Sequence, residues 1–156
     1  MLKLSALFPI HCSDRAISHV FFSVCKEWQG PDLKARMVVP SCDRPCRGSN
    51  LVEAIPSFLN KLYYRNPSLP KIKAEKRFLK DIKDFDVAYL WPGISSDTAK
   101  SVNKYNKPIF FERVNSCQSE SKRILDDAYS RLGLEPQHTI TPESIQDEKE
   151  KLKVID

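Results

Sequence analysis

The stretch FDVAYLWPGISSDTAKSVNKYNKPIFFERVNSC, residues 85–117, decides the fold. It contains two short apolar runs, Asp86–Trp91 and Ile109–Phe111, with a helical segment between them. Each run is too short for a helix and fits a strand that is buried on both faces, as in a parallel sheet. Pro92-Gly93 ends the first run, and Ser95, Ser96 and Asp97 provide N-cap oxygens for the helix that follows. Two buried strands joined by a helix form a right-handed βαβ unit.

A second unit of this kind occupies the first forty residues. Strands are predicted at Leu2–Ile10 and Leu33–Pro40, with a helix between them that Ser13 or Asp14 caps. Further helices are predicted at Leu51–Tyr64, Lys71–Asp84, Ser119–Leu132 (capped by Gly133) and from Thr141-Pro142 onward. This order predicts one α/β domain over residues 1–156, with a Rossmann-like, mostly parallel sheet of four or five strands and helices on both faces. The apolar phrase Leu152–Asp156 at the end suggests a piece of a longer protein.

Composition restricts the class of protein without selecting a ligand. A hydrophobic share of 41% and a charged share of 29% are ordinary for a soluble domain. No apolar stretch approaches the roughly 20 residues of a membrane span. Five cysteines, an odd number, suit reduced thiols in the cytoplasm better than a disulfide framework. The net charge of +5 permits a nucleotide, a phospholipid surface or RNA as partner.

Polar and aromatic residues follow the predicted strands, where ligands bind in open α/β sheets. The candidate binding residues are His11, Asp14, Arg15, Trp91, Glu112, Arg113 and Asn115. Glu112 could orient an acceptor hydroxyl and Arg113 could hold a phosphate, or the two could form ordinary surface ion pairs. His11 could bind a ligand or cap the first helix. Trp91 could stack on a sugar or close the core, and the core is the better interpretation.

Two other features have less specific interpretations. Cys42 and Cys46 share a loop, but no second pair at zinc spacing follows, so no metal site is predicted. The segment 58–83 combines eight lysines and arginines with apolar residues. It is either a solvated helix flank or a peripheral contact with an anionic membrane, which would place a cytoplasmic protein at a membrane surface. Nucleic-acid binding is not expected, because no recognition motif accompanies the basic residues.

Four segments together resemble the N-terminal domain of a GT-B-type glycosyltransferase of the group 1 (family 4) class. They are the opening Leu4–Asp14, the passage FLKDIKDFDV at 78–87, the strand KPIFFE at 107–112 and the closing helix Glu143–Asp156. The resemblance covers nearly the whole chain as a pattern of strands and helices. It implies an enzyme that moves a sugar from a nucleotide-sugar to a glycan, lipid-linked or small-molecule acceptor, with retention and without a bound cofactor or metal.

The same resemblance implies a division of labour. The N-terminal domain holds the acceptor, whereas a C-terminal domain holds the donor through two glutamates with seven residues between them. The pairs Glu112/Glu120 and Glu135/Glu143 have this spacing but stand outside that context. We therefore expect this chain to be inactive without a C-terminal donor domain. The loop His11–Arg15 lacks the usual glycines, and Trp91 and Asn115 stand where relatives carry a histidine, so no catalytic residue is assigned. The alternative function is a stand-alone ligand-binding or regulatory module.

Overall fold

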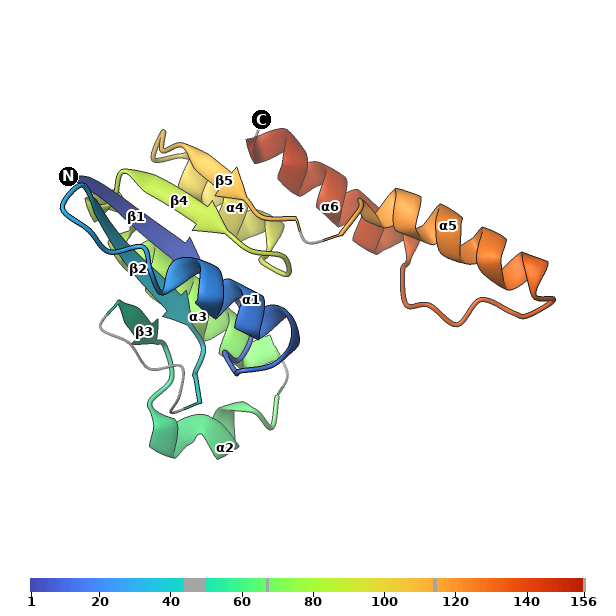
Figure 1. The fold of residues 1–156 in the computed structure, drawn as a ribbon, viewed down its shortest axis with the longest axis horizontal. Coiled ribbons are helices and arrows are strands. Elements are labelled where there is room, and N and C mark those ends of the chain that lie inside the picture. The colour runs from blue at the N-terminus through green and yellow to red at the C-terminus, as the bar shows by residue number, and fades with distance from the viewer. Residues whose placement is uncertain (44–49, 67, 114, 156) are drawn as a thin grey trace.

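A five-stranded, all-parallel sheet forms the centre of the computed structural model, which describes residues 1–43, 50–66, 68–113 and 115–155. The strand order is β3-β2-β1-β4-β5 (Figure 1). The strands are β1 (Leu2–Leu7), β2 (Leu33–Val39), β3 (Leu51–Glu53), β4 (Val87–Leu90) and β5 (Ile109–Phe111). The first three strands therefore follow one another outward from β1 to β3, and β4 and β5 then extend the sheet on the other side of β1. The predicted α/β, Rossmann-like fold is confirmed.

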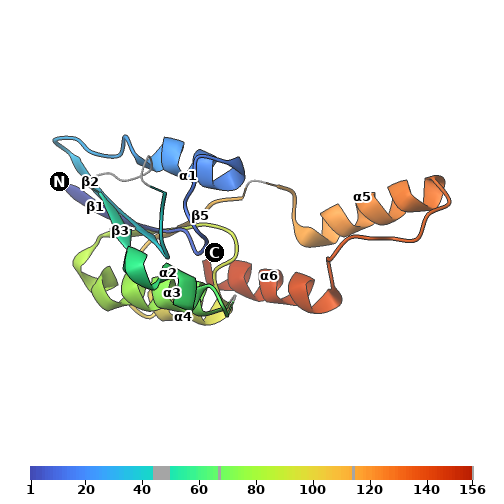
Figure 2. The ribbon, with the colours of Figure 1, turned by 90° about the horizontal axis from the view of Figure 1, so that it is seen from below.

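Helices cover both faces of the sheet (Figure 2). The helix α1 (Ala16–Cys25) lies on one face, and α3 (Ser68–Asp81) and α4 (Ser96–Asn103) lie on the other. The remaining helical segments are η2 (Ser57–Leu59), α2 (Asn60–Tyr63), η3 (Ile82–Asp84), α5 (Gln118–Arg131) and α6 (Pro142–Ile155). None of the described helices is both long enough and apolar enough to span a bilayer.

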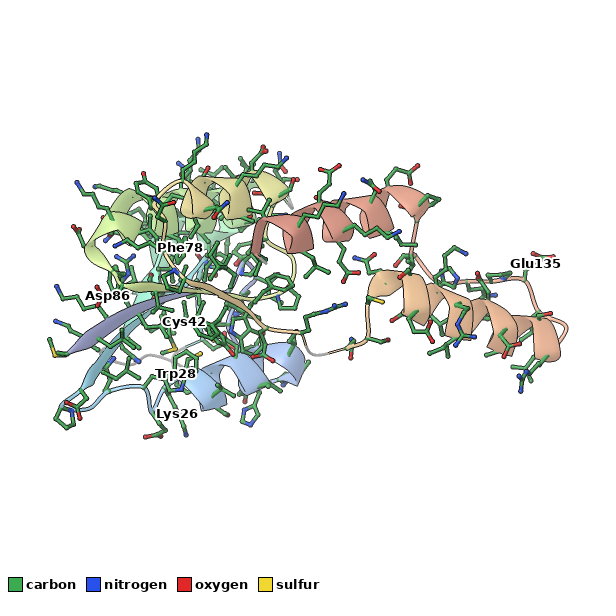
Figure 3. All side chains as sticks on the ribbon, turned by 90° about the horizontal axis from the view of Figure 1, so that it is seen from above. Lys26, Trp28, Cys42, Phe78, Asp86 and Glu135 are labelled. Carbon is green, nitrogen blue, oxygen red and sulfur yellow. The ribbon has the colours of Figure 1, made fainter. Side chains whose placement is uncertain are left out.

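The core consists of two layers because successive strand residues point to opposite faces. On the α1 side, Phe8 stacks on Phe21 with ring centroids 4.5 Å apart, and Trp91 meets both rings edge-on. On the other side, Leu7 and Phe78 belong to a cluster of fully buried side chains. Trp28 and Phe78 accordingly lie on opposite sides of the sheet in Figure 3.

The last two helices form an arm beyond β5 (Figure 1). Helix α6 packs on α4 and β5, and Val154 contacts the core on that face. Helix α5 packs on α6 and has no buried residue. Gly133 ends α5 with φ +67°, a conformation that favours glycine. Glu135, just after it, lies at the far end of the arm (Figure 3). The sheet edge next to β5 is thus flanked by a projecting helical pair.

The helix predicted at Leu51–Tyr64 is wrong over its first half. Leu51–Glu53 forms the edge strand β3, which pairs with β2 in parallel register. Backbone bonds from Met37 N–H to Asn50 and from Ala54 N–H to Val39 continue this pairing beyond the strand. Only η2 and α2 after Pro56 are helical. The apolar run Leu51–Glu53 is too short for its hydrophobic period to distinguish a strand from a helix. It forms a strand because the backbone groups along the side of β2 are available for hydrogen bonding.

The predicted caps are partly right. Ser95 caps α4 by accepting a hydrogen bond from the Thr98 N–H (3.2 Å), and Thr141 caps α6 by accepting one from Ser144 (3.2 Å). The expected cap of α1 is wrong: its N-cap position is Arg15, without a side-chain hydrogen bond. The next residue, Ala16, has φ +48°, so a left-handed turn leads into α1. This tight turn takes Ser13 and Asp14 away from the cap position.

Candidate ligand-binding site

Because the five strands are parallel, their carboxyl ends all lie at the same end of the sheet, which we call the carboxyl edge. In register, Leu7 of β1 pairs with Val38 of β2 and Leu90 of β4, and Leu90 pairs with Phe111 of β5. The segments that follow these strands therefore share that edge. His11 and Glu112, which are 101 positions apart in the sequence (112 − 11), lie at the same end of the sheet, as predicted. This edge carries the candidate site.

A cavity of about 620 Å³ lies beyond the ends of β4 and β5. Its walls come from the start of α1, the turn after β4, the segment after β5, and helices α5 and α6. The lining residues are Ile17, Pro92, Gly93, Phe111, Arg113, Asn115, Ser116, Gln118, Ser121, Ile124, Leu125, Ile140, Glu148 and Lys151. Ile17 follows β1 and Gly93 follows β4, so the cavity begins where the strand order reverses. This is the position at which open α/β sheets bind ligands.

A buried carboxylate on α3 holds the turn after β4 in place. Glu75 of α3 is 7% exposed and accepts hydrogen bonds from the Ser95 N–H (2.6 Å) and from Ser95 Oγ (3.0 Å). At Gly93, φ is +91° and a Cβ atom would lie 3.4 Å from Pro9 Cγ. The hydrogen bonds therefore fix the turn after β4 to α3, and at Gly93 this turn passes close to Pro9 in the segment after β1. Glu75 was not among the predicted site residues, although it lies beside Ala74 on the buried side of a helix.

Arg113 and Asn115 are the two predicted site residues that line the cavity. Arg113 Nη2 lies 3.3 Å from Glu148 Oε1 of α6, and the other oxygen of Glu148 accepts a hydrogen bond from the Gln118 N–H (2.8 Å). Glu148 therefore connects the segment after β5 to the first turn of α5. Ser144 adds a hydrogen bond to the Gln118 side chain (2.5 Å). This network forms the polar side of the cavity, and neither Glu148 nor Gln118 was among the predicted site residues.

Glu112 turns away from the cavity toward the α1 side of the sheet. Its carboxylate accepts a short hydrogen bond from the Tyr89 hydroxyl of β4. Burial, together with the hydrogen bond and charge of Glu112, raises the pKa of Tyr89. Burial, and then the charge of Glu112, raises the pKa of the Cys25 thiol to about 12. Glu112 thus has an internal partner and is not among the cavity-lining residues.

His11 belongs to a separate cluster beyond β1 and β2. Its Nδ1 lies 2.8 Å from Ser41 Oγ, and its Nε2 lies 3.2 Å from Asp43 Oδ1. Ser41 Oγ is also 2.7 Å from the Tyr64 hydroxyl. The order Asp43, His11, Ser41 resembles a nucleophilic triad, but Ser41 is fully buried. A substrate therefore cannot reach the hydroxyl, and we assign the cluster the role of joining three loops at this edge.

The other predicted site residues lie outside the cavity. Trp91 is 1% exposed and packs in the core, which is the interpretation that the sequence favoured. Asp14 and Arg15 are exposed and lie 3.8 Å apart as an ion pair of adjacent residues. Of the seven candidates, the structure brings Arg113 and Asn115 together at the cavity and places the other five elsewhere.

Metal ligation finds no support in the described part of the chain. Among residues 1–43, 50–66, 68–113 and 115–155, no three His, Cys, Asp or Glu side chains are grouped to hold an ion. Cys42 is buried, and Cys46, its neighbour in the predicted loop, lies outside the described residues.

Comparison with known proteins identified no relative: no family model, curated protein or solved structure matches this chain.

Proposed function

We propose that this chain is the acceptor-side half of a two-domain, GT-B-type glycosyltransferase. The observation that carries the proposal is the cavity of about 620 Å³ at the point where the strand order reverses. Its lining combines apolar side chains, such as Ile17 and Phe111, with hydrogen-bonding groups from Arg113, Asn115 and Gln118. Such a mixture suits a molecule that has hydroxyl groups on an apolar frame, as a sugar or a lipid-linked sugar has.

In this proposal the cavity holds the acceptor, and its residues orient the acceptor rather than bind the donor. None of the four glutamates with donor-motif spacing is among the described residues that line the cavity. Glu112 is bonded to Tyr89, and Glu120 forms an ion pair with Arg123 (2.6 Å). Glu135 is exposed at the far end of the arm (Figure 3). Donor contacts would therefore come from a following domain, in the cytoplasm where nucleotide-sugars are available.

A second candidate is a stand-alone ligand-binding module. The observation in its favour is that this chain alone supplies the cavity walls, from α1 to α6. The two functions differ in what the longer gene product contains. A βα domain with the two-glutamate motif after Asp156 supports the transferase, whereas a stop codon at that point supports the binding module.

Substitution at Arg113 tests the site. Arg113→Ala should strongly reduce sugar transfer by the two-domain protein, measured with labelled nucleotide-sugars and a panel of acceptors. Stability should change by less than about 1 kcal/mol, because the partly exposed ion pair with Glu148 contributes little. Arg131→Ala is the matched control, since Arg131 also forms an ion pair, with Asp127 on α5 (2.9 Å), and is not among the cavity-lining residues.

Two results would contradict the proposal. One is full transfer activity in the Arg113→Ala protein with its fold intact. The other is micromolar binding of a nucleotide-sugar by residues 1–156 alone, measured by calorimetry. That affinity would assign the donor, rather than the acceptor, to this half.

A further inference from the structure

An exposed apolar surface is present at η2, α2 and the start of α3. Phe58 is 81% exposed, the highest value among the large hydrophobic side chains of the described residues, and Leu62, one helical turn later, is 57% exposed. Leu69 and Ile72 are also exposed, in the first turns of α3, and Tyr64 is exposed at the C-terminal end of α2. Exposed clusters of this kind mark interaction sites in soluble domains.

The same surface is strongly basic. Residues 57–76 contain Lys61, Arg65, Lys71, Lys73 and Lys76 but a single acidic residue, Glu75. Glu75 is buried and bonded to Ser95, so it does not offset the positive charge outside. Among the described residues, no carboxylate forms a salt bridge with any of the five basic side chains. Lys73 Nζ instead lies 5.4 Å from the centre of the Tyr63 ring, which links α3 to α2. We call Phe58, Leu62, Leu69, Ile72 and these five cations the basic-apolar patch.

The patch ends within α3. Phe78 and Ile82 are fully buried in the core, so in the second half of the segment 58–83 the apolar side chains face the sheet. There Asp81 forms ion pairs with Arg36 (2.7 Å) and Arg77 (3.7 Å). The exposed apolar side chains therefore end at Ile72, whereas exposed basic side chains continue along the segment as Arg77, Lys80 and Lys83.

We propose that the basic-apolar patch binds the surface of an anionic lipid bilayer. In this arrangement Phe58 and Leu62 enter the boundary between headgroups and acyl chains, and the lysines and Arg65 contact lipid phosphates. The combination distinguishes this partner from others. An acidic protein or a nucleic acid provides negative charges for the five cations. A bilayer differs from both because its anionic groups lie directly above a continuous apolar layer, which the exposed apolar side chains can enter.

The patch and the cavity both lie at the carboxyl edge of the sheet. Tyr64, at the end of α2, is bonded to Ser41 beyond β2, which places α2 at the carboxyl edge (Figure 1). A protein bound through the patch would therefore present this edge to the membrane. The proposal does not depend on the proposed transferase function, because it rests on a different surface.

Vesicle co-sedimentation of residues 1–156 tests the proposal. We expect binding to vesicles of phosphatidylcholine mixed with phosphatidylglycerol, little binding to phosphatidylcholine alone, and weaker binding at high salt. Phe58→Asp should reduce binding at least tenfold, because it removes a large apolar group and adds a negative charge. Lys61→Glu changes the charge by two units and should reduce binding roughly 25-fold, given roughly fivefold for each unit of charge lost near the surface. Both side chains are exposed, so folding should be unchanged, which circular dichroism can verify.

Matched controls lie elsewhere on the chain. Leu132→Asp alters an apolar side chain at the C-cap of α5 that is 71% exposed, and Lys104→Glu alters an exposed lysine at the C-cap of α4. Both should bind vesicles as the unaltered protein does. The proposal is overturned if the unaltered protein fails to bind mixed vesicles. It is also overturned if the Phe58→Asp protein binds as tightly as the unaltered protein, or if the two control proteins lose as much binding as the patch variants. Binding to single-stranded RNA but not to vesicles would likewise refute it. The assay contains no sugar substrate, so its failure would leave the transferase proposal unaffected.

Discussion

Glu75→Ala should destabilise the protein far more than an ordinary surface substitution. The carboxylate is buried and accepts two hydrogen bonds from Ser95, one from the backbone and one from the hydroxyl. Hydrogen bonds to a charged group contribute about 1.5–3 kcal/mol each, and since these two share one acceptor group we expect a loss of about 2–4 kcal/mol. For a domain of this size, that corresponds to a fall in Tm of roughly 5–15 °C.

Chemical denaturation followed by circular dichroism measures this effect directly. Glu75→Gln keeps the shape of the side chain and one acceptor oxygen, so it should lose less than half as much stability. Ser95→Ala removes the hydroxyl partner and the cap of α4, and a double-mutant cycle with Glu75→Ala should show coupling between the two residues. Glu135→Ala, in the exposed loop after α5, is the control and should stay within about 0.5 kcal/mol of the unaltered protein. If Glu75→Ala behaves like Glu135→Ala, the buried carboxylate does not hold the wall of the cavity.

Two further predictions concern titrating groups near the sheet edge. Burial and Glu112 raise the pKa of Tyr89 above its usual value of 10, so its stabilising contribution is complete below pH 10 and is lost as pH rises through the folded-state value. Tyr89→Phe should therefore make the free energy of unfolding less dependent on pH above 10, and an unchanged pH profile would contradict this. The pKa of Cys117 is lowered mainly by a hydrogen bond from Ser119, whereas burial raises that of Cys25 to about 12. At neutral pH, iodoacetamide should label Cys117 rapidly and Cys25 only after unfolding, as peptide mass spectrometry can determine; equal labelling rates in the folded protein would contradict it.

Local sequence determined most of the elements and the class of fold. Ser95 and Thr141 stand at the starts of α4 and α6 with an acceptor oxygen for the first turn, and Gly133 provides the left-handed residue that ends α5. Short apolar runs between such signals suit strands buried on both faces, and strands joined by helices must run parallel. The shared carboxyl edge follows from that topology. These features depend on interactions within a few residues, which is why the sequence reveals them.

Tertiary contacts decided the rest. Leu51–Glu53 became a strand because β2 had an open edge to pair with, a partner that lies more than ten residues away. Adjacent residues after β5 then took opposite directions: Glu112 bonds to Tyr89 on one side, and Arg113 faces the cavity and Glu148 on the other. The sequence predicts that a polar residue stands at the end of a strand. The direction of its side chain depends on the pleat of the strand and on which distant residue is near enough to form a hydrogen bond or ion pair with it. The site therefore exists only in the folded chain, because α1, the turn after β4, the end of β5 with the segment after it, α5 and α6 each supply part of its walls.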